Sequence, residues 1–296
     1  MKAVVLAGGY ATRMWPLTKE RPKMFLPIGE STVIDRIFTE LEADDRIDDV
    51  YVSTNERFAP DFEAHLADRE NVDDDLLVIA GDNLISFDIS EFVDAFEERN
   101  APTLAAYDVG SREKAKSYGL VELEGDRVVD FQEKPDDPKS TLVSIACYAF
   151  PQDSVSLLAT YLAGENNPDE PGWFVQWLQD REPTYAYTFE GAWFDIGTPA
   201  SYLDAVAWHL DGEAHIADGA TLKNASIGEN VHVMNGATLS DASVEDTVVF
   251  PGVTLEGTDL ERTIIGEETQ LDDCSLDGAL VGPDLEVTTE SVSSSD

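Results

Sequence analysis

Residues 7–27, AGGYATRMWPLTKERPKMFLP, hold the side chains best suited to chemistry on a phosphate. The 296-residue chain has only 19 lysines and arginines against 60 aspartates and glutamates, and its net charge is −41. Four of the cations nevertheless fall within this segment, at Arg13, Lys19, Arg21 and Lys23. A chain this acidic repels polyanions over most of its surface, which argues against a nucleic-acid partner. The cationic segment beside a Gly-Gly turn instead predicts a place that accepts phosphate groups.

A buried strand must deliver this segment, and KAVVLAG at 2–8 has the apolar run of such a strand. Gly8 and Gly9 then let the main chain approach a phosphate with no Cβ in the way, and the N–H groups of the turn can donate to it. Arg13 and Lys23 add charge that can neutralise a transferring phosphoryl group. The sequence therefore predicts phosphate chemistry at the carboxyl end of the first strand.

Strand-like and helix-like patterns alternate over residues 1–210. This alternation predicts an α/β fold, with a Rossmann-like, mainly parallel sheet and helices on both faces. Ligands of such sheets bind at the carboxyl ends of the strands, where Gly8 and the Gly81-Asp82 pair are expected. The expected strands include 2–8, 50–54 and 76–80, and the expected helices are 31–43, 56–70, 89–99 and 201–210.

From residue 214 the period of the sequence changes. The similar runs GATLKNASI, GATLSDASV, GVTLEGTDL and ETQLDDCSL begin at residues 219, 236, 252 and 268, which are 17, 16 and 16 residues apart. Apolar residues recur every five or six positions, from Ile216 and Leu222 to Val281. Three short faces in each turn of 16–17 residues predict a β-helix. We therefore expect one domain over 1–210, a left-handed parallel β-helix over 214–284 and a disordered tail over 285–296.

The cationic segment resembles the signature of the sugar-1-phosphate nucleotidyltransferases, G-G-x-x-x-R-x-x-P-x-T-x-x-x-P-K-x-x-x-P. Every fixed position is met, by Gly8, Gly9, Arg13, Pro16, Thr18, Pro22, Lys23 and Pro27. The resemblance makes 1–210 the catalytic domain. With the repeats included, the chain resembles glucose-1-phosphate thymidylyl- and uridylyltransferases that carry a C-terminal hexapeptide-repeat β-helix. The nucleotide-binding residues that the resemblance implies are Leu6, Ala7, Gly8, Gly9, Arg13 and Lys23.

Two aspartates are the metal ligands that the resemblance implies. LLVIAGDN at 76–83 is similar to the strand whose Asp binds magnesium, which makes Asp82 the first ligand. AWFDIGTP at 192–199 is similar to the second metal-binding segment, which makes Asp195 the other. Either Asp alone could merely close a turn. As a pair, carboxylates at strand ends suit a hard cation such as Mg²⁺, which a phosphoryl-transfer site needs.

The stretch SYGLVELEGDRVVDFQEKP at 117–135 resembles the family's sugar-binding hairpin. The resemblance implies that Gly119 lets the sugar approach the backbone, that Glu133 accepts hydrogen bonds from its hydroxyls and that Lys134 binds its phosphate. An ordinary β-hairpin followed by polar residues would have the same sequence pattern. Tyr148 falls where the family often places another sugar contact, and core packing explains it equally well. Ala146 stands where Gly or Asn is more usual.

The implied reaction joins a sugar 1-phosphate to a nucleoside monophosphate, with release of pyrophosphate from the triphosphate. The attacking phosphate is already anionic, so positioning and charge neutralisation by Mg²⁺, Arg13 and Lys23 suffice. Arg13, Lys23, Asp82 and Asp195 are the expected catalytic residues. Glucose 1-phosphate with TTP or UTP is the first expectation for the substrates.

Two other functions are open at this point. Only about 21 residues, 55–75, separate two strands where relatives place a base-reading strand and helix, so that element is expected to be missing. A regulatory or binding subunit that has lost turnover would fit this. An acyltransferase on the β-helix would need His215 or His232 as a base, but both are expected on a solvated face. Flat, repetitive faces favour self-association or regulation instead.

Cys147 and Cys274 are too few for a disulfide framework, which favours a cytoplasmic protein. No apolar run approaches the roughly 18–20 residues of a bilayer span, and the first residues do not resemble a signal peptide. The acidity is spread along the chain rather than gathered in one block. A surface adapted to molar salt explains this better than a DNA-mimicking or cation-buffering protein, so a halophilic, archaeal source is expected.

Overall fold

The computed structural model describes residues 1–55, 74–164, 166–167 and 170–288. Its contacts divide the chain into two compact units. The sheet unit contains Met1–Gly8 and Asp35–Trp193, and the coil unit contains Gly9–Ile34 and Phe194–Asp296. Residues 9–34, called the loop segment below, therefore pack with the repeats. The domain limits expected at 210 and 214 stay a prediction.

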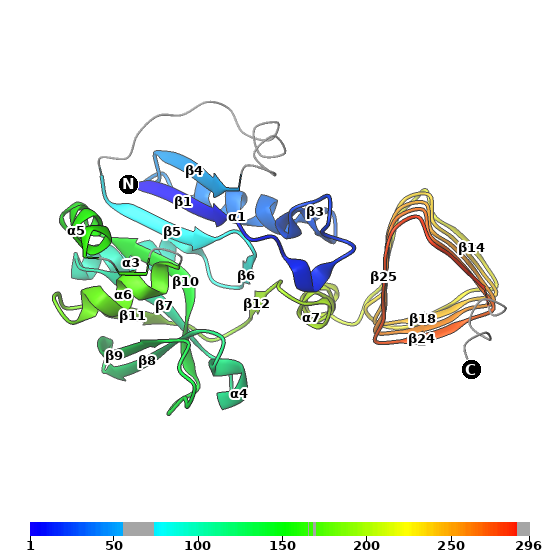
Figure 1. The fold of residues 1–296 in the computed structure, drawn as a ribbon. Coiled ribbons are helices and arrows are strands. Elements are labelled where there is room, and N and C mark those ends of the chain that lie inside the picture. The colour runs from blue at the N-terminus through cyan, green and yellow to red at the C-terminus, as the bar shows by residue number, and fades with distance from the viewer. Residues whose placement is uncertain (56–73, 165, 168–169, 289–296) are drawn as a thin grey trace. The chain divides into compact units, whose positions relative to one another are not determined.

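The sheet unit is built on a mixed sheet that has eight strands in the described residues, in the order β4-β1-β5-β10-β7-β11-β9-β8 (Figure 1). β1 is parallel to β4 and β5, and β7 is parallel to β11. β10 runs antiparallel to β5, β7 and β8, so the sheet is mixed rather than mainly parallel. A buried strand is apolar in either direction, and its pattern could not reveal this reversal. The strands are β1 Lys2–Ala7, β4 Asp49–Thr54, β5 Leu76–Ala80, β6 Asn83–Ile85, β7 Thr103–Asp108, β8 Gly119–Glu124, β9 Arg127–Glu133, β10 Leu142–Phe150, β11 Tyr185–Thr188 and β12 Trp193–Asp195.

Helices cover both faces of this sheet, as predicted. Ala186 of β11 belongs to the buried cluster that also contains Tyr161 of α5 and Phe174 of α6. The next residue, Tyr187, faces the other way, and its ring lies 6.0 Å from Phe92 of α3, because successive side chains of a strand alternate between faces. The helices are α1 Val33–Glu42, α3 Ile89–Arg99, α4 Arg112–Ala115, α5 Gln152–Ala163, α6 Pro171–Gln179 and α7 Pro199–Leu210. The helix expected at 56–70 lies outside the described residues.

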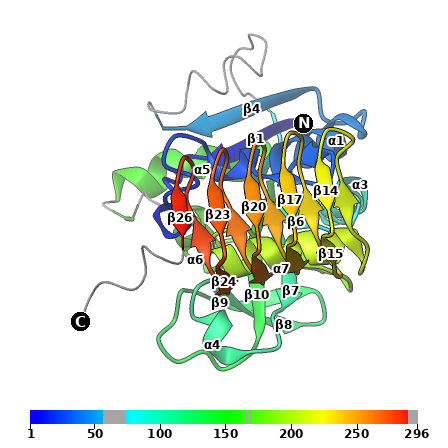
Figure 2. The same ribbon diagram turned by 90° about the vertical axis from the view of Figure 1, so that its right-hand side faces the viewer.

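The coil unit confirms the β-helix. Its repeats form three parallel sheets over residues 215–288, with successive coils paired in register. Figure 1 looks along the coils, and Figure 2 shows them side by side. The first sheet has β13 His215–Ile216, β16 His232–Val233, β19 Val248–Val249, β22 Ile264–Ile265 and β25 Leu280–Val281; the second has β14 Thr221–Lys223, β17 Thr238–Ser240, β20 Thr254–Glu256, β23 Gln270–Asp272 and β26 Glu286–Thr288; the third has β15 Ser226–Ile227, β18 Ser243–Glu245, β21 Asp259–Glu261 and β24 Ser275–Asp277.

The predicted apolar positions form the core of the coils. Each sheet contributes one inward row, such as Leu239, Leu255 and Leu271 of the second sheet, which are at most 1% exposed. Ile216 and Leu222 of the first coil are 37% and 38% exposed, since no earlier coil covers them. The coils also continue past 284, because Val287 of β26 pairs with Leu271 of β23. The disordered tail was therefore expected too early, and its remainder, 289–296, lies outside the described residues.

The loop segment contains two 3-10 turns, Thr12–Met14 and Lys23–Phe25, and a small hairpin of β2 Pro27–Ile28 and β3 Ser31–Thr32. Its apolar side chains are buried and fix the backbone: Met14, Leu17, Met24, Leu26 and Ile28 are at most 4% exposed. Thr18 is also buried, and its hydroxyl donates a hydrogen bond to the carbonyl of Ala11 at 2.9 Å. No helix of the described residues is long and apolar enough to cross a membrane.

Candidate active site

The end of β1 is fixed by its neighbours in the sheet unit. The N–H of Gly81 donates to the carbonyl of Leu6 at 2.8 Å, and the hydroxyl of Thr54 donates to Ala7 at 3.1 Å. The side chain of Asn55 donates to the carbonyl of Gly8 at 3.0 Å. Because Gly81 is bonded to Leu6, the following residue, Asp82, lies at the carboxyl end of β1, where the sequence placed it.

The Gly-Asp-Asn turn is more than a connection. Asn83 is 3% exposed and donates its side-chain N–H to the carbonyl of Ile145. Its amide oxygen accepts a hydrogen bond from the indole of Trp193 at 3.1 Å. Asp82 thus stands between two residues whose positions are fixed by hydrogen bonds, which limits how far its half-buried carboxylate can move.

The glycines of the loop face open space. A Cβ built on Gly8 or on Gly9 would meet no atom within 4 Å, and neither residue has a positive φ. Neither packing nor backbone conformation therefore requires glycine at these two positions. A ligand that approaches the main chain would require it, since only glycine leaves the backbone bare.

Three predicted catalytic residues come together in the coil unit. Lys23 Nζ lies 3.6 Å from Asp195 Oδ1, and the two side chains are 13% and 25% exposed. A Cβ built on Gly197 would lie 3.2 Å from both Arg13 Nη2 and Asp195 Oδ1. Arg13, Lys23 and Asp195 are thus gathered around Gly197. Two cations and a carboxylate in this arrangement can bind phosphate oxygens and a metal ion side by side.

The motif Asp-Ile-Gly-Thr-Pro has a local reason for its shape. Ile196 is fully buried, and the N–H of Gly197 bonds back to the carbonyl of Asp195 at 2.8 Å. Thr198 then caps α7, accepting from the N–H of Ser201, with Pro199 as the first helical residue. The tight turn before a capped helix holds Asp195 at the end of β12.

The sugar-binding prediction falls on a hairpin of the sheet unit. Gly119 pairs with Glu133 across β8 and β9. Cβ atoms built on Gly119 and on Gly172 of α6 would overlap the side chains of Phe131 and Glu133. Gly119 is therefore also required by packing against Phe131. The Glu133 carboxyl lies against α6, and the main-chain N–H of Glu133 donates to the side-chain oxygen of Gln176 at 2.8 Å.

The charge on Glu133 is unusual. Burial, followed by the nearby carboxylate of Glu170, raises the pKa of Glu133 to about 7, although Lys134 opposes the rise. Lys134 itself forms an ion pair with Glu170. A carboxyl that is half protonated near neutral pH can both donate to and accept from sugar hydroxyls. Sequence reasoning missed Glu170 and Gln176, because α6 approaches the hairpin only in the folded chain.

Tyr148 is a core residue in this structure, which is one of the two roles that the sequence left open. It is 4% exposed, its ring lies 6.0 Å from that of Phe150, and burial raises the pKa of its hydroxyl. β10 is irregular just before Tyr148, and this irregularity includes Ala146, which stands where Gly or Asn is more usual. Ala146 has φ 52°, in the left-handed region that favours Gly or Asn, which is why those residues are the expected ones there.

Comparison with known proteins agrees with this geometry. Residues 2–73 and 62–211 match the family model described as Nucleotidyl transferase. The chain belongs to the nucleotidyl transferase family. The bifunctional protein GlmU of Methanocaldococcus jannaschii is 27% identical over 233 residues, which cover 71% of this chain and 55% of that protein. A putative mannose-1-phosphate guanyltransferase of Sulfolobus acidocaldarius is 26% identical over 232 residues, covering 69% and 61%.

This member of the family spans a little over half the length of the curated relatives that it matches. Among solved structures, a putative glucose-1-phosphate thymidylyltransferase from Bacillus anthracis in complex with a sucrose superimposes with a TM-score of 0.60. The identity is 22%, and the match covers 70% of this chain and 94% of the other. That likeness establishes the fold of this nucleotidyl transferase.

The predicted metal ligands are two aspartates, Asp82 and Asp195. Within the described residues no group of three or more His, Cys, Asp or Glu side chains could hold a metal ion. Asp82 belongs to the sheet unit and Asp195 to the coil unit. Mg²⁺ usually keeps several waters and binds through one or two carboxylates plus substrate phosphates. Asp82 and Asp195 each supply carboxylate oxygens, which are donors of the type that this cation takes.

His232 of the β-helix does not provide an open base. His232 is 3% exposed, so its expected place on a solvated face was wrong. Its ring lies 5.0 Å from that of His215. Burial, followed by the nearby His215 and His209, lowers the pKa of His232 to about 4. A buried ring with this preference for the neutral form is poorly placed to take a proton from an incoming substrate.

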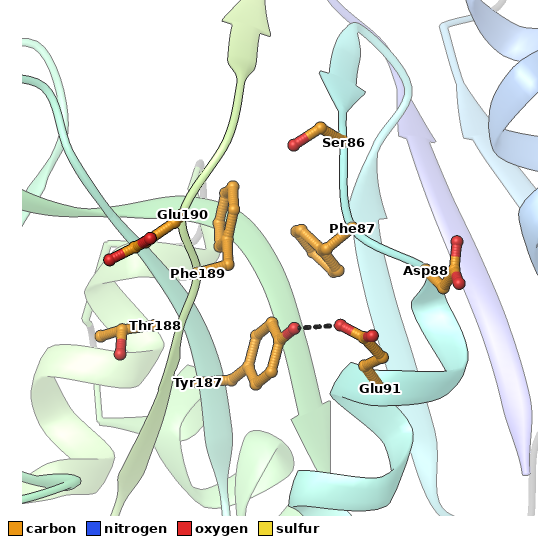
Figure 3. A pocket seen from close by; sticks show the side chains of 8 residues that line it. All are labelled: Ser86, Phe87, Asp88, Glu91, Tyr187, Thr188, Phe189 and Glu190. Atoms are coloured by element: carbon orange, nitrogen blue, oxygen red, sulfur yellow. Dashed lines mark hydrogen bonds between the residues drawn. The ribbon is translucent and has the colours of Figure 1, made fainter.

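A hollow of about 340 Å³ lies elsewhere in the sheet unit (Figure 3). None of the predicted site residues lines it. Glu91 accepts a hydrogen bond from the hydroxyl of Tyr187 at 2.7 Å, and the rings of Phe87 and Phe189 stand 4.5 Å apart. These contacts hold α3 to β11, and they give the hollow a structural role. Its lining residues are Ser86, Phe87, Asp88, Glu91, Tyr187, Thr188, Phe189 and Glu190.

Proposed function

We propose that this protein transfers a nucleoside monophosphate from a nucleoside triphosphate to a sugar 1-phosphate, giving an NDP-sugar and pyrophosphate. The observation that carries the proposal is the grouping of Arg13, Lys23 and Asp195 around Gly197. Family membership supports the same chemistry, and the open backbone at Gly8 and Gly9 leaves room for a triphosphate. The curated relatives include one protein named for mannose 1-phosphate, and one fold neighbour is named for glucose 1-phosphate.

The reaction is a single displacement at the α-phosphorus of the triphosphate. A phosphate oxygen of the sugar 1-phosphate forms the new P–O bond, and the bond to the β-phosphate breaks, so pyrophosphate leaves with the electron pair. The attacking oxygen is already anionic and needs no general base. Arg13 and Lys23 neutralise the charge that develops on the oxygens.

Asp82 and Asp195 are the residues that would hold Mg²⁺, which when bound would neutralise phosphate charge and align the oxygens. Their carboxylates lie at the ends of β5 and β12, the position that the family resemblance assigns to metal ligands. Lys23 stabilises the negative charge of Asp195, and in the proposed complex its ammonium would also bind the triphosphate.

On the sugar side, we propose that Glu133 binds hydroxyl groups and that Lys134 binds the sugar phosphate. Lys134 already has an anionic partner in Glu170. An arriving phosphate must therefore displace this carboxylate, which favours dianionic substrates over neutral sugars. Glucose 1-phosphate with TTP or UTP stays the first candidate. The segment expected to lack a base-reading element, 55–75, lies almost wholly outside the described residues.

The decisive experiment measures pyrophosphate release for five triphosphates crossed with four sugar 1-phosphates in the presence of Mg²⁺. Arg13→Ala and Asp82→Asn should each lower kcat by about a hundredfold or more, since each removes charge stabilisation from the transition state. Arg262→Ala is the matched control, because it removes an exposed cation of the coil unit that pairs with Asp204. Triphosphate binding without any pyrophosphate release would identify a binding subunit instead.

A further inference from the structure

One outward row of the coils becomes apolar from the third coil onward, in contrast to the others. In the first sheet, the residues beside the inward row are His215, His232, Val248, Ile264 and Leu280. Val248 and Ile264 are fully buried although they face out of the coils. The matching positions of the other sheets are polar and exposed, as at Glu256 and Glu261. Another element must therefore cover the first sheet.

The loop segment makes contacts on this side. Arg21 forms an ion pair with Glu267, and its guanidinium lies 5.4 Å from the ring centroid of Phe250. The side chain of Pro16 packs on Gly282, where any Cβ would overlap it. These three coil residues follow β19, β22 and β25, so successive coils contact the loop segment at the same corner.

The contacts with the coils and the predicted catalytic contacts are made by different side chains of the loop segment. Arg21 and Lys23 stand on either side of the buried Pro22, and Arg21 reaches the coils while Lys23 reaches Asp195. The side chains of Arg21 and Glu267 are only 30% and 28% exposed. An ion pair this sheltered from water is screened little by salt. It can therefore fix the loop even in a concentrated electrolyte.

We propose that the β-helix positions the nucleotide loop, and that Glu267 and Phe250 are positioning residues that act through Arg21. This inference rests on the proposed function, because the loop matters only if it holds the triphosphate. Neither residue touches substrate. Their effect is to keep Arg13 and Lys23 at fixed distances from Asp195. The coils are then a structural part of the nucleotide site.

Glu267→Gln tests this, because it keeps the shape of the side chain and removes its charge. KM for the triphosphate should rise about tenfold, the effect of losing roughly 1.4 kcal/mol from a charged hydrogen bond, while KM for the sugar 1-phosphate stays within about twofold. Amide hydrogen exchange of residues 9–34 should become faster. Asp204→Asn is the matched control: it breaks the exposed Arg262–Asp204 pair of the same unit and leaves the loop contacts intact. It should change neither quantity.

The opposite sign would overturn the proposal. If Glu267 merely offsets the charge of the loop, Glu267→Gln would lower KM for the triphosphate and leave exchange at 9–34 unchanged. If Glu267→Gln fails to fold, Phe250→Leu takes its place, because leucine keeps the apolar contact but removes the aromatic ring beneath Arg21. Unchanged amide exchange of residues 9–34 in Phe250→Leu would then overturn the proposal. If the wild type releases no pyrophosphate with any substrate pair, the proposed function fails, and the exchange measurement still decides whether the coils hold the loop.

Discussion

Replacing His232 with leucine should remove a pH-dependent weakness of the coil unit. His232 is 3% exposed, and burial together with the nearby His215 and His209 lowers its pKa from 6.5 to about 4. The folded state therefore accepts the neutral ring. The stability that this ring contributes is complete above the unfolded pKa of 6.5. As the pH falls from 6.5 through 4, the unfolded state takes up a proton that the folded state refuses, and stability is lost.

The size of the effect follows from the pKa difference. A change from 6.5 to about 4 is 2.5 units, and at 1.36 kcal/mol per unit the folded state loses about 3 kcal/mol by pH 4. Leucine should fit the site, because Val248, Ile264 and Leu280 occupy the same row in the next coils. Within the described chain, Nδ1 of His232 has no hydrogen-bond partner that leucine would forfeit. The variant should therefore be at least as stable as the wild type at pH 7.5.

Urea unfolding at constant ionic strength, measured between pH 7.5 and 4, checks this. Carboxylates titrate in both proteins, so the informative quantity is the difference in unfolding free energy between variant and wild type. That difference should grow by about 3 kcal/mol toward pH 4. His215→Leu is the control, and it should keep most of the wild-type slope because burial is the largest cause of the His232 shift. A variant-minus-wild-type difference that stays constant across this range would refute the reasoning.

Three further predictions concern the site and the charge of the chain. Glu133→Gln should abolish any change near pH 7 in KM for the sugar 1-phosphate. As the pH rises from 4.5 through 7, the free energy of unfolding of this variant should increase by up to about 2 kcal/mol relative to the wild type, because Glu133 ionises first in the unfolded state. A difference in unfolding free energy that does not change with pH would contradict this. Gly197→Ala should lower kcat about tenfold with little loss of stability, because its Cβ would press on Arg13 and Asp195; an unchanged kcat would show that these side chains can yield. Removal of salt should unfold the protein, which carries a net charge of −41, and a folded, dissolved protein in salt-free buffer, judged by circular dichroism, would rule out adaptation to molar salt.

Features set by local or periodic patterns could be predicted from the sequence. The coils were predictable because each one repeats the same apolar spacing, as in Leu239, Leu255 and Leu271. Asp82 was predictable as a residue at a strand end, because an apolar run followed by Gly marks where a buried strand stops. The grouping of Arg13, Lys23 and Asp195 was implied by a family pattern, and no rule of spacing joins residues so far apart in the chain.

Features set by long-range packing could not be predicted. Arg21 and Glu267 are 246 residues apart, and no local sequence pattern at either residue predicts their contact. The antiparallel direction of β10 leaves no trace in its apolar pattern. His232 was misjudged because an outward position on a β-helix was equated with solvent. A signal for its burial was nevertheless present, since the doublets Val248-Val249 and Ile264-Ile265 put apolar residues both inside and outside the coils.

Those doublets bear on where the functional unit of this chain ends. A coil that serves only its own core needs one apolar residue at each corner, as the second and third sheets show with Leu255 and Leu260 flanked by polar neighbours. A second apolar residue is stable only if another element covers it. In this chain the first sheet lies in the same compact unit as the loop segment, and Arg21 and Pro16 contact the corners beside it. The change of sequence period near 214 therefore marks a change of architecture, while the contacts of the loop segment extend along the coils to Gly282.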